Sequence, residues 1–164
     1  MRVPRVRARR LGSRLARSIG AEQTYDEDLL DAAAIAPTLL SHASRVARRL
    51  VRSGLWARTV AVKIKYADFT LRTRRATLPE PAQDTDTIYR TALALLARVP
   101  LEARRVRLTG VSVSGLQEGR PPALFVDVST EKRRKVEEVA AQIADRYGDE
   151  RAVTRASLVE RRRR

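Results

Sequence analysis

Residues 59–66 read Thr-Val-Ala-Val-Lys-Ile-Lys-Tyr, and this stretch decides the fold. Successive side chains of an extended chain point to opposite faces. The large apolar side chains of the stretch therefore share one face, and Lys63 and Lys65 share the other. This alternation predicts a strand with one buried face and one basic face that is open to solvent.

Upstream of this strand the spacing of apolar residues becomes that of a helix. Leucine, alanine and valine recur every three or four residues between positions 28 and 52, which predicts an amphipathic helix. Pro37 either begins the regular helix or kinks a longer one, and Gly54 ends it. A short mixed alternation over residues 18–25 predicts a weaker strand before the helix.

Downstream, residues 69–78 predict a second strand that follows a bend. We expect Phe69 and Leu71 on its core face. Arg72 and Arg74 are then expected on the open face, beside the lysines of the preceding strand. The two prolines that come next are expected to stop this strand.

The last strand is expected over residues 105–116. Val106 and Leu108 should face the core. The two valines after Gly110 keep that face only if the alternation slips by one residue, so we expect a β-bulge at Gly110.

Between these strands a second helix is expected to start at Asp84 or Thr85 and to run to about residue 98. The order is therefore βαββαβ, an α+β domain whose four-stranded sheet carries both helices on one face. We divide the chain into a basic arm or linker (1–17), this domain (18–116), and a tail (117–164) that includes an amphipathic helix near residues 131–147.

Composition narrows the classes of function. The chain has 164 residues, 34 Lys and Arg against 19 Asp and Glu, and a net charge of +15. It has no Cys and a single His, His42, so disulfides, thiolate sites and His-based zinc or triad chemistry are not expected. His42 itself is expected at the surface or the edge of a helix. No apolar run approaches the roughly 18 residues of a membrane span, so we expect a cytoplasmic protein. We also expect it to be a monomer.

A strong excess of arginine favours a polyanion as partner, and nucleic acid is the common one. A basic membrane-surface protein and a ribosome-associated protein are the alternatives. Exposed aromatic rings mark single-strand binders, whereas Tyr66 and Phe69 are both expected in the core. The open face, with lysines, arginines and the hydroxyls of Thr70, Ser112 and Ser114, therefore favours a duplex backbone over unstacked bases.

Acidic residues gather at positions 26–28, with Asp31 close by. One interpretation is a metal site. The favoured interpretation places them in the first turn of the helix that follows, where the helix dipole stabilises negative charge.

Four blocks, in the same order, resemble the little finger domain of bacterial Y-family DNA polymerases of the polymerase IV type. They are residues 18–29, 57–70, 72–74 with 77–78, and 106–116. The family often has an Arg-Ser-Arg-Thr-Leu-like run where this chain has Arg-Arg-Ala-Thr-Leu at positions 74–78. Ala76 cannot reach a phosphate, and Arg75 either compensates or points at the helices.

The resemblance implies a βαββαβ domain that binds duplex or primer-template DNA without reading its sequence, within a translesion polymerase that acts in DNA repair. The palm that holds two Mg²⁺ ions lies upstream of the matched segment in the family, so no catalysis and no cofactor are expected from this chain. The expected DNA-contacting residues are Ser18, Gly20, Lys63, Lys65, Arg72, Arg74, Arg105, Arg107, Ser112 and Ser114.

The alternative function is an interaction module that docks on the sliding clamp. Relatives often carry a short clamp-binding peptide near the C-terminus. Leu124 and Phe125 match its last two residues and are apolar anchors in a Gly- and Pro-flanked segment.

Overall fold

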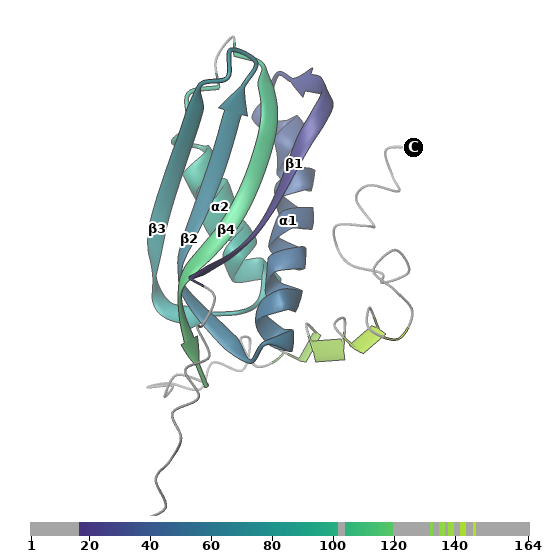
Figure 1. Cartoon of the computed structure of the whole chain (residues 1–164), viewed down its shortest axis with the longest axis vertical. Helices are drawn as coiled ribbons and strands as arrows, with labels where there is room; N and C mark the ends of the chain where they lie inside the picture. The colour runs from purple at the N-terminus through teal and green to yellow at the C-terminus, as the bar shows by residue number, and fades with distance from the viewer. Residues whose placement is uncertain are drawn as a thin grey trace, which may run out of the picture.

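A four-stranded antiparallel sheet carries two helices on one of its faces. The computed structural model describes residues 17–101, 104–119, 132, 135–136, 138–139, 142–143 and 146. The elements are β1 (Ser18–Leu29), α1 (Ala32–Arg52), β2 (Leu55–Tyr66), β3 (Leu71–Ala82), α2 (Thr85–Leu96) and β4 (Val106–Glu118). The strand order is β1-β4-β2-β3, and both helices lie behind the sheet in Figure 1. The predicted βαββαβ fold is confirmed.

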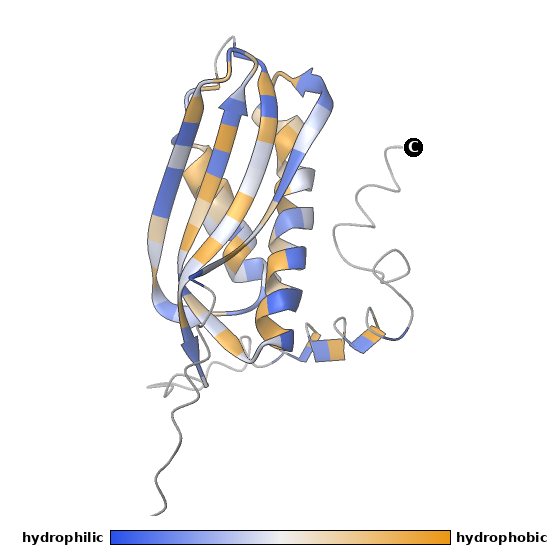
Figure 2. Ribbon diagram, viewed as in Figure 1, coloured by the Kyte–Doolittle hydropathy of each residue, from blue (hydrophilic) through white to orange (hydrophobic). Residues whose placement is uncertain are grey.

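The core lies between the sheet and the helices. Val60, Val62 and Ile64 of the central strand β2 are fully buried, and Tyr66 is 1% exposed. Hydrophobic and hydrophilic residues alternate along β2 in Figure 2, as the quoted stretch predicts. The helices supply the other half of the core, chiefly through Ile35, Leu39, Ala43, Val46, Ala47, Leu50, Ile88, Ala92, Leu95 and Leu96.

The start of α1 corrects the interpretation of the acidic cluster. The helix begins after Asp31, whose carboxylate accepts a hydrogen bond from the backbone N–H of Ala34 at 2.6 Å. The acidic residues 26–28 lie instead in β1, and the first turn of α1 contains no acid. Pro37 lies inside the helix, and Gly54 follows its C-terminal cap with a φ of 63°, which glycine tolerates better than other residues.

The second helix, α2, begins where the sequence predicts. The carboxylate of Asp84 accepts a hydrogen bond from the backbone N–H of Thr87 at 2.9 Å and caps the helix. Among the described residues, no helical segment combines the length and the hydrophobicity of a membrane span.

Strand β3 continues past Pro79 and Pro81, contrary to the expectation that these prolines stop it. The strand lies at an edge of the sheet, where a residue without an N–H need not interrupt the ladder. The pairing of β2 with β3 shifts between Ala57 and Thr59 of β2, opposite this proline segment. The prolines therefore produce an irregular end of an edge strand.

The predicted bulge exists, but at a different residue. Lys65 pairs with Leu108 and Tyr66 pairs with Val106, so Arg107 is the extra residue of β4. Val106 faces the core, whereas Leu108 leaves the sheet on the opposite side. Gly110 lies in regular pairing opposite Lys63. The prediction of a bulge at Gly110 was therefore wrong by three positions.

His42 is buried in α1, not at the surface, and is 1% exposed. Its Nε2 lies 3.3 Å from the hydroxyl of Thr109, which in turn lies 2.7 Å from the hydroxyl of Tyr25. Burial and the neighbouring guanidinium of Arg45 lower the pKa of His42 from 6.5 to about 4, against smaller opposing effects of Thr109 and Glu22. The imidazole is therefore neutral at pH 7 inside the core.

This buried imidazole should make the domain acid-sensitive. The pKa of His42 is about 4 in the folded state and about 6.5 in the unfolded state, so between these values the unfolded chain binds more protons and stability falls as pH falls. From pH 7 to pH 5 the loss is expected to be about 2 kcal/mol, measurable by urea denaturation. His42→Gln should flatten this pH dependence, and an unchanged slope in that variant would refute the assignment.

Candidate nucleic-acid interface

The sheet face away from the helices consists of four rows that cross all four strands. Residues paired across antiparallel strands send their side chains to the same face, so the strand registers define each row. In the order β1-β4-β2-β3 the rows are Ser18-Ser114-Thr59-Thr77, Gly20-Ser112-Ala61-Arg75, Glu22-Gly110-Lys63-Thr73 and Thr24-Leu108-Lys65-Leu71. We call these residues the open face.

The first row presents a hydroxyl on every strand, and the second adds Ser112 and Arg75. Ser18, Gly20, Lys63, Lys65, Ser112 and Ser114 therefore lie where the predicted interface requires them. The open face carries three cations and one acid, and most of its other side chains are small or hydroxylated. Such a surface can approach a phosphate backbone closely and donate hydrogen bonds to it.

Arg72 and Arg74 are not on the open face. They pair with Ile64 and Val62, so their side chains leave the sheet on the helix side, where both are exposed. The cause is the turn before β3. Thr70 pairs with Tyr66, because the backbone N–H of Tyr66 donates to the carbonyl of Thr70 at 3.0 Å, and this sets the alternation of β3 opposite to the one expected.

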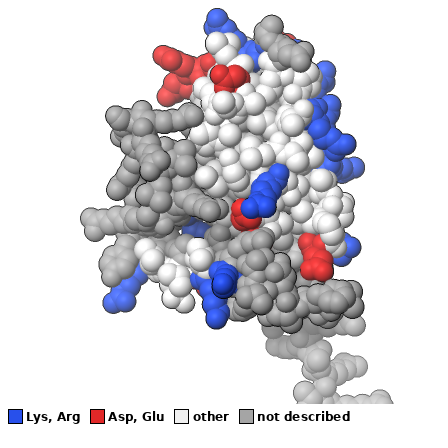
Figure 3. Space-filling model, turned by 180° about the vertical axis from the view of Figure 1, so that it is seen from behind, with Lys and Arg blue, Asp and Glu red and all other residues white. Residues whose placement is uncertain are grey.

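Arg75, and not Arg74, lies on the open face, where it pairs with Ala61. The arginines of β3 therefore project from both sides of an edge strand. Figure 3 views the molecule from the helix side, where Lys and Arg follow the right-hand edge at the position of β3. The turn comprises residues 67–69, one residue more than the bend before a strand that starts at Phe69, and this one residue assigns Arg75 instead of Arg74 to the open face.

Lys63 does not stand alone on the open face. Its Nζ lies 2.9 Å from Oε2 of Glu22, and this ion pair spans β4 at Gly110. A Cβ atom at Gly110 would lie 2.8 Å from Cγ of Glu22, so the glycine leaves room for the pair. Both side chains are partly exposed, and such a pair contributes at most about 1 kcal/mol.

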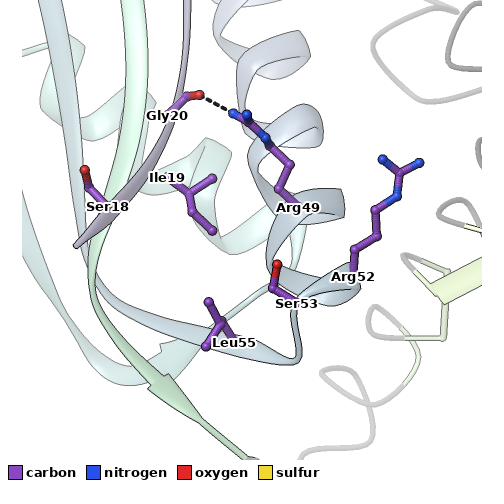
Figure 4. A pocket seen from close by; sticks show the side chains of 7 residues that line it. All are labelled: Ser18, Ile19, Gly20, Arg49, Arg52, Ser53 and Leu55. Carbon is purple, nitrogen blue, oxygen red and sulfur yellow. Dashed lines mark hydrogen bonds between the residues drawn. The ribbon is translucent and has the colours of Figure 1, made fainter. Parts of the chain in front are cut away.

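Gly20 lies on β1 beside a hollow of about 350 Å³ between this strand and the C-terminal end of α1. Arg49 donates a hydrogen bond from Nη1 to the carbonyl oxygen of Gly20 at 2.8 Å (Figure 4). Ser18, Ile19 and Leu55 line the same hollow. The arginine thus satisfies a carbonyl of an edge strand and holds β1 against the helix.

Phe69 is on the surface, contrary to the expectation that it packs in the core. Its side chain is 63% exposed at the turn between β2 and β3. The Nζ of Lys65 lies 4.8 Å from the ring centroid, and Cζ of Arg107 lies 5.4 Å from it. Arg107 therefore faces this end of the sheet, and Arg105, just before β4, is exposed.

The turn that carries Phe69 is held by charged groups. Asp68 accepts a hydrogen bond from the backbone N–H of Thr70 at 2.9 Å, and Nη2 of Arg104 lies 2.8 Å from its other oxygen. The hydrogen bonds from Thr70 and the smaller effect of Arg104 hold the pKa of Asp68 below its usual value. Arg104 also stacks over the ring of Tyr66 at 4.2 Å.

The acidic cluster gives no metal site. Among the described residues, no group of three or more His, Asp or Glu side chains is arranged to hold a metal ion.

Leu124 and Phe125, expected to bind a clamp, lie outside the described residues. In the tail, the described positions between 132 and 146 are helical, with Val136, Val139 and Ile143 exposed.

These observations define the class of the protein: an α+β domain whose two helices cover one sheet face and leave the other polar and cationic. Comparison with known proteins gives the family. Residues 16–124 match the model of the impB/mucB/samB family C-terminal domain. The chain belongs to this family and is a little finger domain of Y-family DNA polymerases of the polymerase IV type.

Curated relatives cover most of the chain. DNA polymerase IV of Corynebacterium diphtheriae is 40% identical over 114 residues, which are 70% of this chain and 25% of the relative. DNA polymerase IV of Desulfatibacillum aliphaticivorans is 37% identical over 137 residues, 81% of this chain and 35% of the relative. The chain thus spans about a quarter to a third of the length of these relatives.

Solved structures share the fold. A complex of the beta-clamp processivity factor with the little finger domain of PolIV superposes with a TM-score of 0.52 at 23% identity, over 68% of this chain and 99% of that one. DinB from Sulfolobus solfataricus gives a TM-score of 0.55 at 17% identity, over 62% of this chain and 29% of that one. At these identities the likeness establishes the fold alone.

Proposed function

We propose that this chain binds duplex or primer-template DNA without reading its sequence, as the little finger portion of a translesion polymerase in DNA repair. The observation that carries the proposal is the open face, which no described helix covers and which combines cations with a row of hydroxyls. Its side chains suit phosphate oxygens, whose contacts give affinity and position but no sequence information.

The composition of the open face argues against direct base reading. Side chains that discriminate bases in the major groove are chiefly Arg, Asn and Gln. The four rows contain no Asn or Gln, and Arg75 is their single arginine. Lysines and hydroxyls contact phosphates at any sequence, so affinity should depend on salt much more than on sequence.

Strand β3 adds a second contact surface at the edge of the sheet. Arg75 projects on the open side, and Arg72 and Arg74 project on the helix side. All three are exposed. We propose that the open face contacts one phosphate strand and that Arg72 and Arg74 contact phosphates reached around this edge.

Catalysis is not part of the proposal for this chain. The matched segment is the C-terminal domain of relatives that are about three to four times as long. We propose that the domain grips DNA while nucleotidyl transfer and its Mg²⁺ ions belong to other domains of such polymerases. Docking on a sliding clamp through Leu124 and Phe125 stays a prediction, supported by the solved clamp complex of a little finger domain.

Reversal of two open-face charges should weaken DNA binding strongly. The variant Lys65→Glu/Arg75→Glu replaces two cations of the open face, so affinity for a duplex should fall by more than about tenfold. The slope of log K against log salt should also drop by about 2, since each lost phosphate contact removes about 0.9. Fluorescence anisotropy over a salt series measures both quantities.

The matched control is Arg45→Glu/Arg90→Glu, which makes the same change in net charge with exposed residues of the two helices. It should retain most of the affinity. Equal losses in the two double variants would show that net charge, and not the open face, determines binding, and would refute the assignment of the interface.

Removal of the acid on the open face should strengthen binding. Glu22 pairs with Lys63 at 2.9 Å, and bound DNA must compete with this carboxylate. Glu22→Gln is expected to raise duplex affinity by up to about 5-fold, because the exposed pair is worth at most about 1 kcal/mol. Glu80→Gln, at an exposed position near the prolines of β3, is the control. An unchanged affinity in Glu22→Gln would show that the Glu22 carboxylate does not compete with DNA for Lys63.

A further inference from the structure

Phe69 is the one large aromatic side chain that the described residues expose and that the proposed phosphate contacts do not use. It occupies the third position of a three-residue turn. Its own N–H donates to the carbonyl of Tyr66 at 2.9 Å, and the N–H of Tyr66 donates to the carbonyl of Thr70 at 3.0 Å. The position therefore has a defined geometry.

The backbone of Phe69 is left-handed, with a φ of 65°. In hairpins with this loop length the left-handed position normally carries glycine, and asparagine also tolerates it. A phenylalanine there strains the backbone, and its ring is not buried enough to compensate by packing. Turn stability alone does not explain this residue.

The surroundings of the ring are cationic. Lys65 and Arg107 lie 4.8 and 5.4 Å from the ring centroid. Lys65 belongs to the last row of the open face, next to Leu71 and Leu108. The ring thus stands at the end of the proposed phosphate track, with a flexible cation from each of two strands beside it.

We propose that Phe69 stacks on an unpaired nucleobase of a DNA strand that continues beyond the duplex held on the open face, while Lys65 and Arg107 bind its neighbouring phosphates. The inference rests on the proposed function. An aromatic ring accepts any base face, and stacking combined with cations is the usual means of holding single strands. Because the side chains beside the ring, Lys65 and Arg107, are cationic, a negatively charged nucleic-acid strand is the ligand that fits this surface.

Leu30 provides the contrast. It is 65% exposed, close to the value for Phe69, but it lies at the turn between β1 and α1 among the acidic residues Asp28 and Asp31. A polyanion would be repelled there. Exposure of a large apolar side chain therefore does not by itself indicate a DNA-binding site. What distinguishes Phe69 from Leu30 is the pair of cations beside its ring, Lys65 and Arg107.

The test compares three ligands that differ only beyond the duplex: a blunt duplex, the same duplex with a short single-stranded overhang, and the same overhang with abasic sugars. The last two carry equal charge. The wild-type chain should bind the overhang with bases at least about 5-fold more tightly than the abasic one, from the stacking of a single base. Phe69→Asn should abolish this difference and leave blunt-duplex affinity unchanged.

Asparagine suits the left-handed backbone, so Phe69→Asn should melt at the same temperature as the wild type or higher, and misfolding would not explain a loss of binding. Leu30→Asn is the matched surface control and should keep the preference for bases. Phe69→Trp should keep it too, and its indole fluorescence should be quenched by the overhang with bases and not by the abasic one, measured against the background of Trp56.

Two results would overturn the inference: a wild-type chain that binds both overhangs equally, or a Phe69→Asn variant that retains the preference for bases. Failure of the wild type to bind blunt duplex would instead contradict the proposed function. In that case the comparison of base-containing and abasic single strands decides the role of Phe69 by itself.

Discussion

The structure depends on the strict alternation of residues 59–66 in β2. The strand is paired on both sides, so each side chain of this stretch either enters the core or joins the opposite surface. Val60, Val62 and Ile64 bind the helices to the sheet by burial of apolar area, the dominant favourable term in folding. Lys63 and Lys65 are thereby held in fixed positions on the other side. The eight residues 59–66 thus specify the core on one side of the sheet and present the charges of the two lysines on the other.

The open face is graded from one end to the other. The row at Ser18 presents hydroxyls, the central rows add one ion pair and Arg75, and the row at Lys65 ends beside the ring of Phe69. A strand lying along this gradient would meet hydrogen-bond donors first, then cations, then an aromatic surface. The acids of β1 (residues 26–28) follow the row at Lys65, so they lie at the same end of the sheet as Phe69 but on the opposite edge strand. They discourage a polyanion from crossing the sheet toward β1 at that end.

Much of this follows from the sequence, because strands and helices with long regular patterns specify their own partners. The element order, the Asp84 cap of α2 and the core face of β2 could be predicted, whereas Asp31 was expected in the first turn of α1 and caps it instead. The faces of β3 could not be predicted from alternation alone, since a single residue in the turn decides whether Arg74 or Arg75 joins the open face. His42 and Thr109 were unpredictable for another reason: polar side chains that contact each other in a core look like surface residues in a sequence.

The proline segment of β3 has a consequence for the proposed binding to DNA, where several copies could occupy one duplex. Neighbouring copies on one duplex would bring sheet edges together at high local concentration, and an unpaired edge can accept another strand. Pro79 and Pro81 offer no N–H for such pairing, and the arginines on both sides of β3 repel an identical strand. We therefore expect the β3 edge to resist pairing with a second copy of the chain when domains lie close together.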